Sequence, residues 1–146
     1  MGDGSLSEDM VSRVAACFER LAPPDVVSAY VFGSHGQNRP HRESDLDVGV
    51  VMDRRLRRSR RDRFEASTRL SGALQAELGF ARLDLVVLDD APPTFSRRVV
   101  LDGRRVYCRD AEDDHAFVRA VQLRAADLEP FLRRTRALKM EALAPR

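Results

Sequence analysis

The chain has 146 residues, 43% hydrophobic and 33% charged, with a formal net charge of +2. This length suits one domain with a proper core, and so small a charge does not by itself indicate nucleic-acid binding. Two cysteines, Cys17 and Cys108, exclude a disulfide framework. Neither a secretory signal nor an apolar run of the roughly 20 residues that span a bilayer is recognised, so we expect a cytoplasmic protein.

The first predicted helix begins at a capping box, in which Ser5 is followed by Glu8. The prolines Pro23 and Pro24 end it. Apolar residues recur between them at helical spacing, as expected of a core-facing stripe: Met10, Val14, Phe18 and Leu21. The sequence gives this helix a structural role.

A buried strand is predicted over residues 26–32, and it ends abruptly at Gly33-Ser34. Gly33 has no Cβ, so its backbone can approach a ligand closely, and Ser34 adds a hydroxyl and an N–H group. A turn that opens a helix at this point would direct free N–H groups at a phosphate.

Ten residues after Ser34, the chain enters a second strand with Asp45-Leu46-Asp47. The strand period of two places Asp45 and Asp47 on one face and the apolar residues that alternate with them on the other. Two neighbouring carboxylates repel each other and add nothing to a core. They are the hard oxygen ligands that suit Mg²⁺, which is usually bound through one or two carboxylates and substrate phosphates.

The arginine-rich run at residues 54–63 has two interpretations. It can be the solvated start of a helix whose apolar side continues through Phe64, Leu70, Leu74 and Leu78 to Gly79. It can also be a patch for an acidic partner or a triphosphate. We favour the solvated face, because charge runs on helices usually face solvent.

The rest of the chain is predicted to form two strands and two helices. A third strand over residues 82–88 carries Asp84, and a short helix after Pro92-Pro93 places Phe95 and Val99 inward and ends at Gly103. An edge strand over residues 104–108 precedes a last helix, opened by Asp110 with Asp113. Its apolar face is Phe117, Val121, Leu128, Phe131, Leu132 and Leu138, and Pro130 should kink or restart it.

The motif Gly33-Ser34, ten residues, Asp45-Leu46-Asp47, with Asp84 on a later strand, resembles the signature of the polymerase-β-type nucleotidyltransferase superfamily. The short chain and its tail also resemble the minimal nucleotidyltransferases, which are antitoxin partners of HEPN-domain toxins. The resemblance implies an α+β nucleotidyltransferase fold over residues 1–146: a small mixed sheet, helices packed against it, and a long C-terminal helix.

The resemblance also implies roles for the motif residues. Asp45 and Asp47 would bind two Mg²⁺ ions, and Asp84 would bind the catalytic ion and assist as base. Gly33 and Ser34 would hold the β- and γ-phosphates of ATP. Otherwise, each acid is a solvent-facing residue and Gly33-Ser34 is a plain turn; a chance combination of all of them at this spacing is the less favoured interpretation.

Three functions follow from the resemblance. The chain can be an antitoxin that transfers AMP from ATP to a tyrosine of a HEPN-domain RNase, with no direct contact with nucleic acid expected. It can be a binding antitoxin of the same fold, whose catalysis is dispensable. It can be a small-molecule nucleotidyltransferase of the antibiotic-modifying kind, although those relatives usually carry an extra helical domain.

Overall fold

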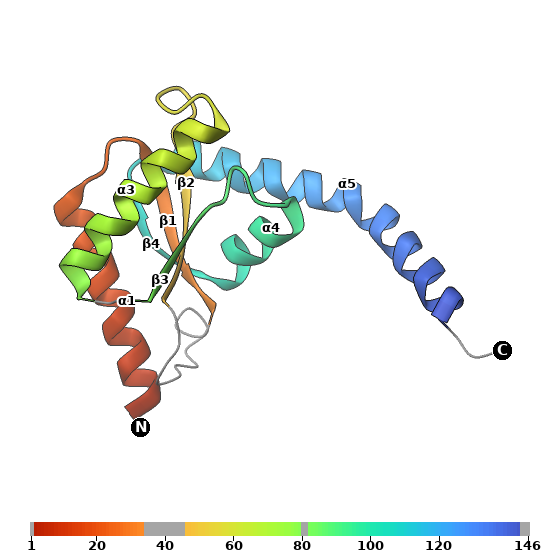
Figure 1. The fold of residues 1–146 in the computed structure, drawn as a ribbon, viewed down its shortest axis with the longest axis horizontal. Coiled ribbons are helices and arrows are strands. Elements are labelled where there is room, and N and C mark those ends of the chain that lie inside the picture. The colour runs from red at the N-terminus through yellow and green to blue at the C-terminus, as the bar shows by residue number, and fades with distance from the viewer. Residues whose placement is uncertain (1, 34–45, 80–81, 144–146) are drawn as a thin grey trace.

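A four-stranded mixed sheet, covered by helices on both faces, organises the chain (Figure 1). The computed structural model describes residues 2–33, 46–79 and 82–143. The strand order is β3-β2-β1-β4. β1 (Val26–Phe32) pairs antiparallel with β2 (Leu46–Met52) and with β4 (Arg104–Cys108), and β2 pairs in parallel with β3 (Leu83–Val87). The three predicted strands and the predicted edge strand are confirmed.

The two faces of the sheet hold separate cores, because side chains alternate along each strand. On one face, Leu46, Val48 and Val50 pack with α1 (Gly2–Leu21) and α3 (Arg60–Leu78). On the other face, Tyr30 and Val51 pack with α4 (Pro93–Asp102) and the start of α5 (Ala111–Leu143). Asp47 shares this second face, opposite the main core, as its strand period predicts.

The helix boundaries confirm most of the predicted signals. α3 begins after Ser59, whose hydroxyl accepts a hydrogen bond from the Asp62 N–H at 3.0 Å, and ends at Gly79 with φ +64°. Asp110 caps α5 by accepting from the Asp113 N–H at 3.1 Å. The prediction for α1 is wrong at its start: the helix already begins at Gly2, so Ser5 lies inside it.

One residue on the predicted apolar side of α3 is exposed to solvent instead of buried. Phe64 is 67% exposed, whereas its neighbour Arg63 is 3% exposed. Burial of Arg63 is possible because it is fully paired: its guanidinium donates to both oxygens of Asp90 at 2.7 and 2.8 Å and to the carbonyls of Arg57 and Arg58. Leu70, Leu74 and Leu78 are buried as predicted.

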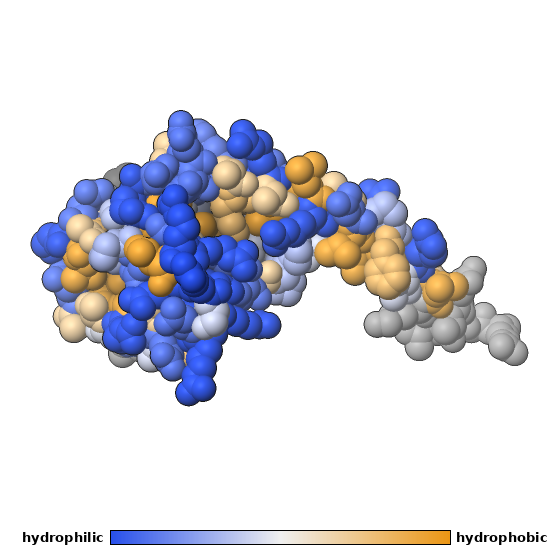
Figure 2. Space-filling model, turned by 90° about the horizontal axis from the view of Figure 1, so that it is seen from above, coloured by the Kyte–Doolittle hydropathy of each residue, from blue (hydrophilic) through white to orange (hydrophobic). Residues whose placement is uncertain are grey.

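α5 is one helix of 33 residues, and it runs through Pro130 without restarting. Its first half packs against α4 and β1. Figure 2 shows its second half projecting from the body as an arm on which hydrophobic and charged residues are mixed. In the described part of the chain, we find no helix with the length and apolar character needed to cross a membrane.

Candidate functional site

Gly33 ends β1 in a conformation that few other residues adopt, with φ +72°. A Cβ built on Gly33 would lie 2.3 Å from Oδ2 of Asp47 and 3.3 Å from its Cγ. The backbone of Gly33 therefore lies directly against the Asp47 carboxylate, and any side chain at this position would displace it. This close approach explains why the strand must end in glycine.

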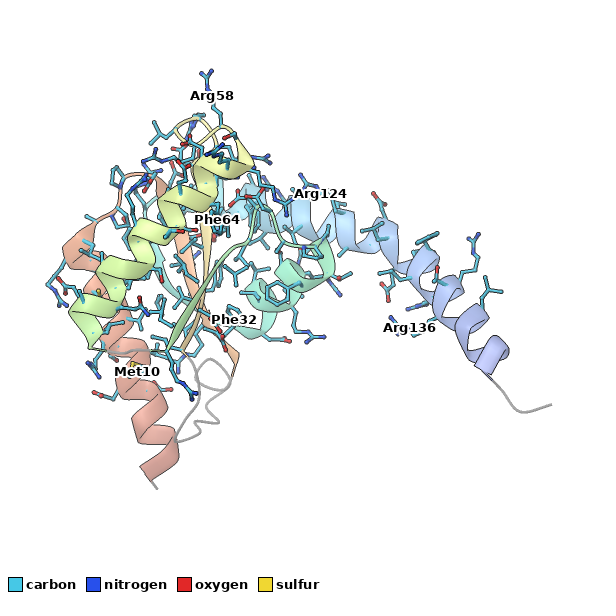
Figure 3. All side chains as sticks on the ribbon, viewed as in Figure 1. Met10, Phe32, Arg58, Phe64, Arg124 and Arg136 are labelled. Atoms are coloured by element: carbon cyan, nitrogen blue, oxygen red, sulfur yellow. The ribbon has the colours of Figure 1, made fainter. Side chains whose placement is uncertain are left out.

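Asp47 and Asp84 occupy adjacent positions on parallel strands. In the sheet register, Asp47 pairs with Asp84 on β3 and with Phe32 on β1. Asp47 is partly buried and Asp84 is exposed. The end of β1 and the starts of β2 and β3 thus meet at one end of the sheet, where Figure 3 shows Phe32. Two acids and a glycine turn lie together there.

The structure brings together three of the five predicted site residues, Gly33, Asp47 and Asp84. Ser34 and Asp45 lie outside the described residues. Within residues 2–33, 46–79 and 82–143, no three His, Cys, Asp or Glu side chains form a group that could hold a metal ion. The third acid of the predicted set is Asp45, so the described pair of carboxylates supplies two of the three expected oxygen donors. The chemistry of this pair suits Mg²⁺.

A pocket of about 230 Å³ opens beside Gly33, between β1 and α4. Phe32 and Phe95 form one wall as an edge-to-face pair with ring centroids 5.6 Å apart. Arg98 and Asp102 add charged groups to the lining. Gly103 allows α4 to end close to β1, because a Cβ there would lie 2.9 Å from the carbonyl oxygen of Val31. Phe95 was predicted to face inward, and it also packs against the core on this face of the sheet, whereas no sequence pattern indicated Arg98 or Asp102.

The opposite end of the sheet holds acids in ion pairs. Asp53, 7% exposed, accepts from Arg55 at 3.2 Å and from Arg109 at 3.1 Å. The hydrogen bond from Arg55 holds the pKa of Asp53 below its ordinary value. The bond from Arg63 does the same for the pKa of Asp90. Burial raises the pKa of Asp89, whose Oδ1 accepts from the Met52 N–H at 2.8 Å.

These ion pairs revise the interpretation of the arginine run. Arg57 donates to Asp25 at 2.9 Å and Arg63 is buried, so neither belongs to a solvated face. Arg61 is 87% exposed and pairs with Glu65 along the helix, as a solvated face predicts. The prediction of a solvated helix start is therefore wrong for part of the run, whose arginines hold the loop after β2 onto the sheet.

A buried polar cluster on the α5 side was missed by the sequence analysis. Asp114, 1% exposed, accepts from Ser28 at 2.6 Å, Tyr30 at 2.8 Å and Arg105 at 2.9 Å. Burial, with the bond to Asp114, raises the pKa of the Tyr30 hydroxyl. The cluster fixes the first turn of α5 to β1 and β4. An acid in the first turn of a helix is common, so no local pattern indicated that Asp114 is buried.

The chain matches known proteins along most of its length. Residues 16–112 match the family model described as polymerase beta, nucleotidyltransferase. The chain is 28% identical over 100 residues to the protein adenylyltransferase MntA of Shewanella oneidensis, a match that covers 68% of this chain and 67% of the relative.

Solved structures share the fold. The crystal structure of a toxin–antitoxin with AMP-PNP superposes with a TM-score of 0.63 at 24% identity, covering 92% of this chain and 98% of the other. An MNT antitoxin in complex with tri-AMPylated Shewanella oneidensis HEPN toxin gives 0.57 at 22% identity, covering 97% and 99%. A minimal nucleotidyltransferase gives 0.53 at 28% identity, covering 66% and 92%. At such identities the first two show a common fold.

Proposed function

Because the chain belongs to the polymerase beta nucleotidyltransferase family, we propose that it is an antitoxin that transfers AMP from ATP to a tyrosine of a HEPN-domain toxin. Its similarity to a protein adenylyltransferase supports AMP transfer to a protein. The HEPN partner is suggested by a structure of the same fold in complex with an AMPylated HEPN toxin. We further propose that residues 1–146 act as one cytoplasmic nucleotidyltransferase domain.

The single observation that carries this proposal is the contact between Gly33 and the Asp47 carboxylate, with Asp84 beside it in register. Gly33, with Ser34, would present backbone N–H groups to the β- and γ-phosphates. Asp45, Asp47 and Asp84 would hold two Mg²⁺ ions, whose chemistry is to neutralise the triphosphate and the departing pyrophosphate. The register of Asp47 and Asp84 supports this assignment, because it places two carboxylates, the oxygen ligands that suit Mg²⁺, at adjacent positions of neighbouring strands.

The reaction forms one bond and breaks one. The tyrosine oxygen of the acceptor attacks the α-phosphorus of ATP, and the bond from that phosphorus to the bridging oxygen of pyrophosphate breaks. Asp84, the exposed acid of the pair, would accept the phenolic proton. The pocket formed by Phe32, Phe95 and Arg98 is smaller than typical ligand pockets of 300–1,000 Å³. The nucleoside part of ATP would bind in this pocket.

Transfer to the partner tests the proposal directly. The chain, a HEPN-domain toxin, ATP and Mg²⁺ are incubated together, and intact-mass spectrometry should show one or more added AMP groups on a tyrosine of the toxin. The Asp84→Asn variant should bind the partner and add none. If the wild-type chain binds and inhibits the partner without adding AMP, it is a binding antitoxin. Transfer to an aminoglycoside instead would make it a small-molecule nucleotidyltransferase.

A further inference from the structure

The two halves of α5 have different surroundings, although one apolar stripe runs along both. In the first half, Val121 and Ala125 are each 3% exposed, and Phe117 packs against the core beside α4. In the second half, Leu128 and Leu132 continue the stripe at intervals of three and four residues, as one face of a helix requires. Leu128 is already 40% exposed, because the body of the protein ends there.

Beyond Leu128 the stripe has large apolar side chains in contact with water. Phe131 is 63% exposed and Leu138 is 61% exposed. Figure 1 shows this part of α5 extending past α4 and away from the sheet, and Figure 3 places Arg136 on the same projecting arm. The spacing of Leu128, Phe131, Leu132 and Leu138 is that of the anchor residues with which a helix fills a groove on another protein.

The second half of α5 projects away from α4 and the sheet (Figure 1). Helices in proteins draw most of their stability from tertiary packing of an apolar face. Pro130 weakens the arm further, since it cannot donate a backbone hydrogen bond. A partner that covers the stripe would therefore both bury apolar surface and stabilise the helix.

The charges around the stripe indicate what kind of partner fits. Between Leu128 and Leu138 the sequence has three arginines, at positions 133, 134 and 136, and one acid, Glu129. Glu129 already pairs with Arg133 at 2.8 Å. A second copy of the chain would bring two sets of the same arginines together, which is unfavourable. An acidic surface is complementary.

We propose that the second half of α5, from Leu128 to Leu138, is the docking surface for the protein that accepts AMP. Its counterpart is an apolar groove rimmed by acidic side chains. This inference rests on the proposed function, because a transferase that modifies a separate protein must hold that protein through a surface. Docking on the arm would keep the acceptor attached while its tyrosine enters the site near Gly33.

Two matched variants test the surface. Phe131→Asp places a charge on the arm, and Phe64→Asp places the same charge on α3, at a phenylalanine that is 67% exposed on the other face of the sheet. Both side chains are exposed, so both variants should fold and should bind ATP with Mg²⁺ as the wild type does. Calorimetry against the HEPN-domain toxin that the wild-type chain binds should show affinity weakened roughly 30-fold or more by Phe131→Asp. Phe64→Asp should leave it unchanged.

The arginines add a second measurement. The double variant Arg133→Glu, Arg136→Glu should slow association with the same HEPN protein, most strongly at low salt. Unchanged affinity of Phe131→Asp, with AMP transfer intact, would overturn the docking surface and leave the proposed function standing. Wild-type chain that neither binds nor modifies the HEPN protein would overturn the function itself. If the wild-type chain self-associates, and Phe131→Asp abolishes this while leaving HEPN binding intact, then the arm binds a second copy of the chain and the proposal is overturned.

Discussion

The two ends of the sheet hold their acidic residues in opposite ways. At the end where β2 finishes, Asp53 and Asp90 each accept hydrogen bonds from arginines, and those bonds lower their pKa values. At the end where β2 begins, Asp47 lies in register with another acid, Asp84, and against the backbone of Gly33. Acids neutralised by arginines hold a fold together. Acids placed side by side supply oxygen donors that a cation can bind, and this difference separates a structural cluster from a candidate site.

Asp47→Asn should have the largest effect, and only on chemistry. It removes one of the proposed Mg²⁺ ligands, which contribute several kcal/mol of transition-state stabilisation, so AMP transfer should fall by roughly 1,000-fold or more. Without metal, the variant should melt close to the wild-type temperature, because Asn keeps the shape of the Asp47 side chain that lies against Gly33. A variant that melts well below wild type without metal would place Asp47 among the structural acids.

Arg63→Ala should have the next largest effect, and only on stability. It leaves the Asp90 carboxylate, whose side chain is 16% exposed, without its buried partner, at a cost of about 3 kcal/mol. Arg61→Ala is the matched control: it removes an exposed i,i+4 pair and should change stability by less than about 0.5 kcal/mol. Chemical denaturation measures both, and similar losses in the two variants would contradict the ion-pair account.

Gly33→Ala should moderately lower both the stability of the protein and its rate of AMP transfer. Its Cβ would meet the Asp47 carboxylate and its φ of +72° is strained for alanine, a cost of about 1–2 kcal/mol. The displaced carboxylate should also lower AMP transfer. Measured together, melting temperature and transfer rate should both fall in this variant. A drop in stability with normal transfer would separate Gly33 from the site.

The smallest effect should be the pH-dependent part of what the Arg63–Asp90 ion pair contributes to the free energy of unfolding. Because arginine lowers the folded-state pKa of Asp90 below its ordinary value of 3.8, the ion pair stabilises the protein above that value. The contribution is lost as pH falls through the lowered pKa. Asp90→Asn should therefore be less stable than wild type near neutral pH, and the gap should narrow below about pH 3.8. A gap that is constant with pH would show that the charge of Asp90 is unimportant.

The sequence predicted what depends on local pattern. The strands, the glycine end of α3, and the placement of Asp47 opposite the main core all follow from periods of two and 3.6 residues and from turn chemistry. The burial of Arg63 could not be predicted, because it depends on Asp90, 27 residues away in the chain. The Asp114 cluster was missed for the same reason: its donors come from β1 and β4, and no local pattern records such partners.

The candidate site was predictable in part. Gly33, Asp47 and Asp84 are visible in the sequence, because a glycine after a strand and acids within apolar strands contradict the local preference for core residues. The pocket beside these residues was not predictable. Arg98 and Asp102 lie on α4 and approach Gly33 only because that helix packs on β1.

The position of β1 in the sheet has a consequence for how the chain folds. One edge of β1 pairs with β2, which follows it closely in sequence, but the other pairs with β4, and the buried cluster on β1 closes only through Asp114, 86 residues after Ser28. Pairings of such long range form slowly. Until residues 104–114 have been synthesised, the central strand keeps an open edge, which invites pairing with other chains. Nascent or truncated chains that stop before β4 should therefore aggregate, and native folding awaits the synthesis of the first turn of α5.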